Sequence, residues 1–247
     1  MVALPREIGG IPLDEIGATG WGLSHVADVA REYCDLELHN ARFVVQGFGA
    51  VGMHAARFLT DMGAVLVGAA DSRGAIHNPD GLDVVRLSDI KAAGGALGEY
   101  VDATPLERDA VIDIECDIWI PAARPDVIHE KNAQRLKTKL VIEGANIPIT
   151  PGAEALLAER GILCVPDFIA NAGGVICAAM EYHGASEGTV LQAIKEKLRR
   201  NTRLVLEDAT RRNISPRQAS VELALARVKK AMSYRRYSLF STAPGFV

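Results

Sequence analysis

The sequence predicts an α/β fold in which helices cover both faces of a mostly parallel sheet, with a helical lead-in before it and a helical extension after it. Short apolar runs alternate with helical patterns as far as Val165. One of these runs, 42–46, leads directly into the glycine-rich sequence 47–52, which opens a helix. After Val165 only helical periodicity remains. Together these observations indicate a Rossmann-type, doubly wound sheet.

Each expected strand is an apolar run bounded by turn residues or by the end of a helical pattern. The strands are expected at 42–46, 65–71, 117–121, 140–143 and 162–165. Turns are expected at 72–74 and 77–81, where Gly, Asn and Pro gather. Residues 1–18 are expected to be irregular, and the residues from Ser241 onward to be loose.

The expected helices follow from apolar residues at three- and four-residue spacing or from capping signals. One of them is a short helix opened by the Thr104-Pro105-Leu106-Glu107 capping box. The others are expected at 19 to 36–39, 50–62, 83–93, 126–134, 150–160, 171–183, 187–212 and 215–237. We therefore divide the chain into a lead-in at 1–40, a dinucleotide-binding domain at 41–185 and a helical extension at 186–247, all in one compact unit.

Composition excludes several classes of protein. The chain has 247 residues, 49% of them hydrophobic, and a net charge of −4 without a long basic run, so we expect no nucleic-acid partner. The longest apolar run, 62–70, is too short to span a bilayer. The four cysteines form no C-x-x-C pair, which indicates reduced thiols rather than disulfides or a zinc site. We expect a soluble, cytoplasmic protein without a metal and without a membrane partner.

The sequence Gly47-Phe48-Gly49-Ala50-Val51-Gly52 has the spacing of a dinucleotide-binding loop. The first glycine permits a tight turn, the second lets the backbone approach a pyrophosphate, and the third lets the helix pack against the strand. The helix N-terminus then offers free N–H groups to the phosphates. Asp71 follows about 20 residues later, where a carboxylate accepts ribose hydroxyls. An ordinary glycine-rich turn is the alternative, but strand, glycines, helix, strand and acid all agree here.

A series of further motifs extends this pattern over most of the chain. They are A-T-G at 18–20, Q-G-F-G-A-V-G at 46–52, D-S at 71–72, N-P-D-G-L at 78–82, P-A-A at 121–123, E-G-A-N at 143–146, P-D at 166–167 and N-A-G-G-V at 171–175. In this order they resemble the dinucleotide-binding half of the glutamate/leucine/phenylalanine/valine dehydrogenase family. The resemblance runs from Gly9 to about Tyr237.

The resemblance implies that an amino acid is oxidatively deaminated to a 2-oxo acid and ammonia while a hydride passes to a nicotinamide. It implies cofactor contacts for Thr19, Gly47, Phe48, Gly49, Ala50, Val51, Gly52, Asp71, Ser72, Ala122, Ala123, Asn146 and Asn171. It also places Val175 and Ala178 on the substrate side. Asn146 and Asn171 have an alternative interpretation as turn or N-cap residues, because Asn favours both positions.

The family's acid–base lysine and aspartate belong to an N-terminal domain that this sequence does not contain. We therefore expect no catalytic residue in this chain, no turnover by the chain alone, and the missing catalytic domain as its partner. Formation of a homo-oligomer stays open. The first alternative is a non-catalytic nucleotide-binding or regulatory module. The second is a different Rossmann dehydrogenase complete in one chain, for which the sequence offers no convincing catalytic constellation.

Two positions bear on the substrate and two on the cofactor. Ala178 and Glu15 stand where glutamate-specific members carry a serine and an arginine, so a branched-chain or other apolar amino acid is the alternative to glutamate, which leads by overall resemblance. Asp71 favours NAD because a carboxylate repels a 2′-phosphate. Arg73 lies nearby and has the chemistry to accept that phosphate. We expect NAD to be preferred over NADP.

Overall fold

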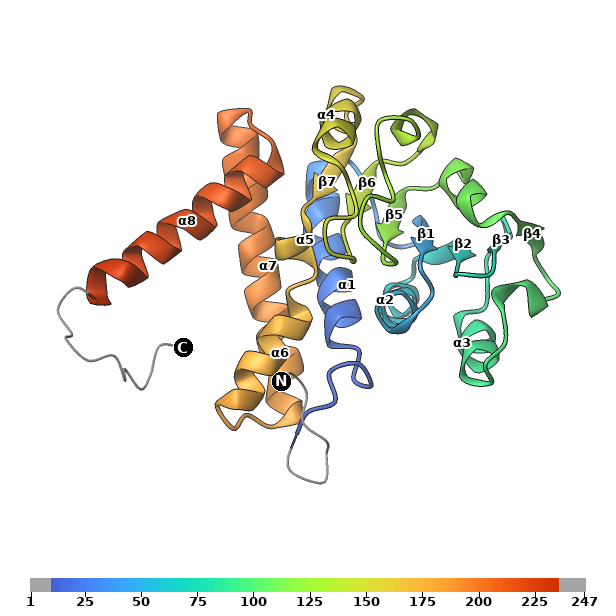
Figure 1. The fold of residues 1–247 in the computed structure, drawn as a ribbon, viewed down its shortest axis with the longest axis horizontal. Coiled ribbons are helices and arrows are strands. Elements are labelled where there is room, and N and C mark those ends of the chain that lie inside the picture. The colour runs from blue at the N-terminus through green and yellow to red at the C-terminus, as the bar shows by residue number, and fades with distance from the viewer. Residues whose placement is uncertain (1–9, 236–247) are drawn as a thin grey trace.

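The computed structural model describes residues 10–235 and shows a sheet with helices on both faces (Figure 1). The strands are β1 (Arg42–Gln46), β2 (Val65–Ala70), β3 (Ala75–His77), β4 (Thr104–Leu106), β5 (Ile118–Pro121), β6 (Leu140–Ile142) and β7 (Leu163–Val165). The α-helices are α1 (Ala18–Ala30), α2 (Ala50–Asp61), α3 (Val84–Ala92), α4 (Pro151–Glu159), α5 (Asp167–Ala170), α6 (Gly173–Tyr182), α7 (Glu187–Arg212) and α8 (Pro216–Arg235). Short 3-10 turns lie at Arg31–Tyr33, Leu97–Glu99, Arg108–Asp113 and Ala133–Arg135.

The seven strands lie in the order β4-β3-β2-β1-β5-β6-β7. Five of them are parallel, while β3 and β4 pair antiparallel at one edge, so the expected mostly parallel α/β sheet is confirmed. The chain moves outward from β1 through β2 to β4 and then returns to the other side of β1 with β5. The switch point of the topology therefore lies between β1 and β5, and open α/β sheets bind ligands at this point.

The core has two layers because successive residues of a strand point to opposite faces of the sheet. Phe43 and Val45 of β1 pack under α1 and α2, whereas Val44 packs on the other face with Trp119 of β5. Helix α1 is buried around most of its circumference, because it packs against α2, α6 and α7 as well as the sheet. The lead-in helix is thus part of the main core.

Three expectations about local structure are wrong. Thr104–Leu106 is strand β4 rather than the start of a helix, because it pairs with β3 at the sheet edge, where a proline is tolerated. Residues 126–134 form no α-helix: Asp126 has a φ of 53°, and only the 3-10 turn Ala133–Arg135 follows. Strand β3 lies between the two expected turns, and with three residues it is too short to show a periodicity.

Some helix ends also differ from expectation. Helix α1 ends at Ala30 and continues only as the 3-10 turn Arg31–Tyr33, short of the expected 36–39. The helix expected from Asn171 begins at Gly173, and a separate short helix, α5, precedes it. The end of α8 expected at 237 and the loose tail from Ser241 lie outside the described residues.

Helix α8 leaves the body of the protein and forms its own projection (Figure 1). Its exposed side chains include Val221, Leu225, Val228 and Met232. Their spacing of three and four residues places them in one stripe along the helix. The structure thus exposes an apolar stripe on α8.

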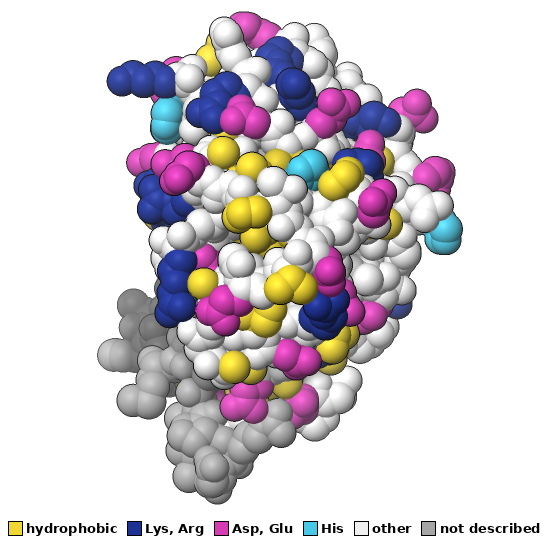
Figure 2. All heavy atoms as spheres, turned by 90° about the vertical axis from the view of Figure 1, so that its right-hand side faces the viewer, with side chains coloured by type: hydrophobic (Ala, Val, Ile, Leu, Met, Phe, Trp, Pro, Cys, Tyr) yellow, Lys and Arg dark blue, Asp and Glu magenta, His cyan; other side chains and the backbone are white. Residues whose placement is uncertain are grey.

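The opposite side of the molecule, at the right of Figure 1, carries basic and acidic side chains that alternate (Figure 2). Neither sign forms a continuous area on this face. Within residues 10–235, no helix combines the length and the apolar character needed to span a bilayer.

Candidate dinucleotide-binding site

The glycine loop follows β1 at the switch point of the sheet. Gly47 has a φ of +105°, and a Cβ there would lie 2.6 Å from the backbone nitrogen of Ala123. A Cβ at Gly52 would lie 2.1 Å from the carbonyl oxygen of Gly47, so only glycine lets the helix approach the loop this closely. A Cβ at Gly49 would meet no atom within 4 Å. The open space above Gly49 is where a pyrophosphate can approach the backbone.

Helix α2 offers its N-terminus to the same space. Its N-cap is Gly49, which makes no side-chain capping bond. The first-turn N–H groups of Ala50 and Val51 therefore stay available to an anion, and the helix dipole favours negative charge there. The N–H groups of Gly47 and Phe48 donate to the carbonyl oxygen of Ala70 at 2.9 and 2.8 Å, which fixes the loop to the end of β2.

Backbone hydrogen bonds join the loops that follow β1, β5 and β6. The N–H of Ala122 donates to the carbonyl oxygen of Gln46 at 2.7 Å. The N–H groups of Gly144 and Ala145 donate to the carbonyl oxygen of Pro121 at 3.0 and 2.8 Å. These three loops form one continuous wall along the carboxyl edge of the sheet.

The two predicted asparagines meet at the far end of this wall. Asn171 Nδ2 donates to Asn146 Oδ1 at 2.8 Å and lies 3.4 Å from the carbonyl oxygen of Ala145. Asn146 itself is exposed. One amide thus orients the other, and the exposed amide remains accessible to a ligand.

Thr19, in the first turn of α1, lies at the end of this wall next to α6. A Cβ at Gly173 would lie 2.2 Å from the carbonyl oxygen of Ala18, and a Cβ at Gly174 would lie 3.1 Å from Thr19 Oγ1. Thr19 therefore sits beside the N-terminus of α6. The sequence prediction placed Thr19, the glycine loop, Ala122, Ala123, Asn146 and Asn171 in one site, and the structure brings them to one edge of the sheet.

Asp71 lies just beyond β2, with only 6% of its side chain exposed. Its Oδ1 accepts the N–H groups of Arg73 and Gly74 at 2.8 and 3.2 Å, and its Oδ2 accepts Lys91 Nζ at 2.8 Å. The Leu97 N–H lies 3.4 Å from Oδ2. A carboxylate has about four acceptor positions, so its own neighbours engage most of this group.

Charge at Asp71 is set by opposing effects. Burial favours the neutral acid, but the hydrogen bonds from Lys91 and from the Arg73 N–H outweigh it and hold the pKa of Asp71 below its ordinary value. The Arg73 side chain turns away and donates to the Gly94 carbonyl oxygen at 3.2 Å. Lys91 was missed by the sequence prediction. Its only signal was a basic residue in the last turn of a helix, which is common for other reasons.

On the substrate side, Val175 is 72% exposed on α6, and Ala178 is half-buried one turn later. Ser72 is exposed at the turn after β2. Within residues 10–235, no group of three or more His, Cys, Asp or Glu side chains is placed to hold a metal ion. The four cysteines are free thiols.

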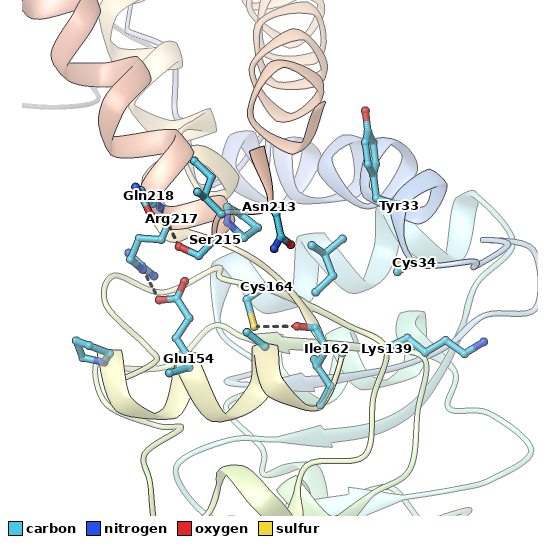
Figure 3. Close-up of a pocket in the computed structure, with 17 residues that line it drawn as sticks. Tyr33, Cys34, Lys139, Glu154, Ile162, Cys164, Asn213, Ser215, Arg217 and Gln218 are labelled. Atoms are coloured by element: carbon cyan, nitrogen blue, oxygen red, sulfur yellow. Dashed lines mark hydrogen bonds and ion pairs between the residues drawn. The ribbon is translucent and has the colours of Figure 1, made fainter. Parts of the chain in front are cut away.

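A cavity of about 800 Å³ lies elsewhere, between the edge strand β7, α4 and the turn that joins α7 to α8 (Figure 3). None of the predicted cofactor residues lines it. The candidate dinucleotide site is therefore the open carboxyl edge of the sheet, and not this cavity.

Comparison with known proteins gives one family over nearly the whole chain. Residues 9–236 match the model of the family described as Glutamate/Leucine/Phenylalanine/Valine dehydrogenase. The NADP-specific glutamate dehydrogenase of Saccharolobus shibatae is 34% identical over 239 residues, covering 94% of this chain and 56% of that protein. The NAD-specific glutamate dehydrogenase of Staphylococcus aureus is 35% identical over 227 residues, covering 90% of this chain and 55% of that protein.

Among solved structures, a hetero-hexameric glutamate dehydrogenase from Thermus thermophilus in a leucine-bound form superposes with a TM-score of 0.84 at 29% identity. The match covers 96% of this chain and 56% of that one. This chain thus spans about half the length of the relatives it matches.

Proposed function

This chain belongs to the Glutamate/Leucine/Phenylalanine/Valine dehydrogenase family, and we propose that it is the nicotinamide-dinucleotide-binding part of an amino acid dehydrogenase. In the reaction an L-amino acid transfers a hydride from Cα to the nicotinamide and becomes an imino acid, which water hydrolyses to a 2-oxo acid and ammonia. The observation that carries this proposal is the continuous wall at the carboxyl edge, where the glycine loop, Ala122, Asn146 and Thr19 line up.

When bound, the nicotinamide supplies the hydride acceptor, and the residues of this chain bind and orient it. The first-turn N–H groups of α2 neutralise the pyrophosphate above Gly49. Ala122 and Ala123 are small, so they leave room for the inner ribose. The amides of Asn146 and Asn171 hydrogen-bond to the ribose, the carboxamide or the substrate.

The proposed substrate is glutamate, because the relatives of known specificity are named glutamate dehydrogenases. Val175 and Ala178 give the substrate side an apolar surface in this chain, which supports an apolar amino acid as the alternative. Activity assays of the full-length context with glutamate, leucine and valine would separate the two substrate classes.

For the cofactor, we propose NAD with NADP as the weaker ligand. The ionised Asp71 disfavours a 2′-phosphate. Lys91 partly cancels that repulsion, so the discrimination is small. The relatives include both an NAD-specific and an NADP-specific enzyme, and either cofactor is compatible with the glycine loop.

We propose that the chain alone does not turn over, because proton transfer at the amine needs a positioned acid–base group within hydrogen-bond reach. The carboxyl-edge wall offers amides, glycines and alanines at that place. A non-catalytic nucleotide-binding module is the second candidate. Its support is that Glu15 and Ala178 stand where glutamate-specific members carry an arginine and a serine.

Binding of NADH by the isolated chain, followed by fluorescence, tests the proposal. Gly49→Val puts a side chain into open space, so the variant keeps its fold but fills the space for the pyrophosphate. We expect a loss of affinity of about tenfold or more, the value of one or two charge-assisted hydrogen bonds. Gly188→Val is the matched control, since a Cβ there also meets no atom within 4 Å. Absence of NADH binding in the unmodified chain, or equal binding in both variants, contradicts the proposal.

The two candidates differ in what the catalytic half would add. If the chain is a dehydrogenase part, joining it to the lysine-bearing half of a relative produces amino-acid-dependent NADH formation. If it is a non-catalytic module, the joined protein binds NADH and stays inactive.

A further inference from the structure

A buried ionic cluster lies directly behind the asparagine end of the wall. At its centre is Arg217, the second residue of α8. Arg217 Nη2 lies 2.7 Å and 3.0 Å from the two carboxylate oxygens of Glu143, which follows β6. Arg217 Nη1 lies 3.4 Å from Asp167 Oδ1, at the start of α5, and Arg217 Nε donates to Glu154 of α4. One guanidinium thus ties four elements together.

The three carboxylates of the cluster are held away from water, whereas the Arg217 side chain is 28% exposed. The side chain of Glu143 is fully buried, and those of Glu154 and Asp167 are nearly so. Figure 3 shows Arg217 reaching from α8 to Glu154 on α4, at the border of the cavity beside β7. Removing one partner of a buried ion pair leaves an uncompensated charge, so each carboxylate depends strongly on Arg217.

Two of these carboxylates hold the loop that carries Asn146. Asp167 Oδ2 accepts the N–H of Ile147 at 2.8 Å, and Glu143 Oε2 accepts the N–H of Asp167 at 3.1 Å. Ile147 has a φ of +51°, a conformation that a β-branched residue avoids. The loop therefore keeps a strained backbone at Ile147, which is held on one side by the Asp167 carboxylate and on the other by the Asp126 N–H, a donor to the Ile147 carbonyl oxygen at 3.0 Å.

The same cluster reaches the second asparagine. The N–H of Asn171 donates to the carbonyl oxygen of Asp167 at 2.7 Å, and its side chain then bonds to Asn146. The Asp167 carboxylate, which Arg217 contacts, thus holds the Asn146 loop, while Asn171 is joined to the same residue by a backbone bond. Among the described residues, Arg217 donates to Glu143, Glu154 and Asp167, and it makes no hydrogen bond to the glycine loop or to either amide.

We propose that Arg217 is a positioning residue for the nicotinamide half of the dinucleotide: through Glu143 and Asp167 it fixes loop 144–147 and the Asn146–Asn171 pair. The inference rests on the proposed function, since it assigns those amides to the nicotinamide side. It gives α8, which lies 74 residues beyond Glu143 in the chain, a direct part in cofactor binding.

The test separates the two halves of the dinucleotide. NADH carries the nicotinamide and its ribose, whereas ADP carries only the adenosine diphosphate half, which meets the glycine loop and the end of β2. In Arg217→Gln we expect the Kd of NADH to rise about tenfold, the value of one charged hydrogen bond, while the Kd of ADP stays within about twofold. Arg217→Lys keeps a positive charge but lacks the planar guanidinium, so we expect its Kd for NADH to lie between those of the unmodified chain and Arg217→Gln.

The control is Arg227→Gln, also on α8, which breaks only a hydrogen bond to Asn201 at the surface. We expect it to bind NADH and ADP like the unmodified chain. Hydrogen exchange gives a second readout: the Ile147 amide exchanges faster in Arg217→Gln than in the control. Unchanged NADH affinity, a parallel loss of NADH and ADP affinity, or unchanged exchange at Ile147 would each overturn the inference.

Asp167→Ala covers the case in which Arg217→Gln does not fold. It removes the acceptor of the Ile147 N–H and leaves Arg217 paired with Glu143 and Glu154. The same selective loss of NADH affinity is expected, and its absence overturns the inference. Failure of the unmodified chain to bind either ligand counts against the proposed function instead, so the two results are distinguishable.

Discussion

Replacing Lys91 by glutamine tests the proposal that the site distinguishes NAD from NADP. Lys91 Nζ lies 2.8 Å from Asp71 Oδ2, and the two side chains are only 22% and 6% exposed. An ionised Asp71 by itself would repel a 2′-phosphate, and the ammonium beside it offsets that charge. Lys91→Gln keeps a polar side chain of similar reach but removes the positive charge.

The magnitude follows from Coulomb's law. A unit charge about 6 Å from one negative charge of the 2′-phosphate contributes about 1.4 kcal/mol at an effective dielectric constant of about 40, between the values for water and for a protein surface. That energy corresponds to about tenfold in a dissociation constant. NAD has no 2′-phosphate, and its ribose gains an acceptor when Asp71 Oδ2 is released. We therefore expect the ratio of the NADP Kd to the NAD Kd to rise about tenfold, mainly through weaker NADP binding.

Calorimetric titration of both cofactors measures this ratio. Arg86→Gln is the matched control, because it lies on the same helix and breaks an exposed ion pair with Asp102. The effect should shrink at high salt, since the 2′-phosphate position is open to solvent. A ratio in Lys91→Gln within about twofold of the unmodified value, in a folded protein, would refute the idea that Asp71 and Lys91 face the 2′ position. Tighter binding of NADP than of NAD by the unmodified chain would contradict the proposed NAD preference.

Three further predictions concern stability and surface properties. Gly47→Ala should lower the free energy of unfolding by about 1–3 kcal/mol, because φ is +105° and the new Cβ meets the Ala123 backbone; an unchanged urea midpoint would contradict this. Burial raises the pKa of Glu143 from 4.5 to about 7, although Arg217 opposes the shift. Between these values the folded state binds more protons than the unfolded state, so stability from this group is present at low pH and is lost as the pH rises. Glu143→Gln should remove this pH dependence of the free energy of unfolding, which amounts to on the order of 2 kcal/mol between pH 5 and 8. Identical pH dependence in the variant and the unmodified chain would show that Glu143 does not titrate in this range. The double substitution Leu225→Ser and Met232→Ser should reduce binding of a hydrophobic dye without changing NADH affinity, and undiminished dye binding would place the apolar surface elsewhere.

The parts of the fold that sequence predicts are those encoded by neighbouring residues. Strand β1, the glycine loop and helix α2 follow one another directly, and each has its own local signal of apolar run, glycine spacing or helical period. Strands β3 and β4 have three residues each and owe their conformation to pairing with one another and with β2. No local pattern distinguishes such a strand from a turn.

The charged contacts of the site escape sequence prediction for a related reason. Lys91 meets Asp71 across 20 residues, and Arg217 meets Glu143 across 74. Each pair is created by the way that helices pack on the sheet. In the sequence, Lys91 is one more basic residue in a final helical turn, and Arg217 follows the helix-opening Pro216 like any exposed first-turn residue. Only the packing of these helices on the sheet brings Lys91 and Arg217 to their specific carboxylates.

Close contacts of α1 with α2 and α6 link the lead-in segment to the candidate site. Glycines stand where two elements touch: a Cβ at Gly20 of α1 would lie 2.5 Å from the backbone nitrogen of Ala55 in α2, and one at Gly173 of α6 would lie 2.2 Å from the Ala18 carbonyl oxygen. These close contacts place Thr19 between α2 and the N-terminus of α6. Helix α1 also buries much of the core against α7. The lead-in segment therefore contributes twice, once to the core and once to the proposed nicotinamide end of the site, while the glycine loop is built from β1, α2 and their neighbours β2 and the loop after β5.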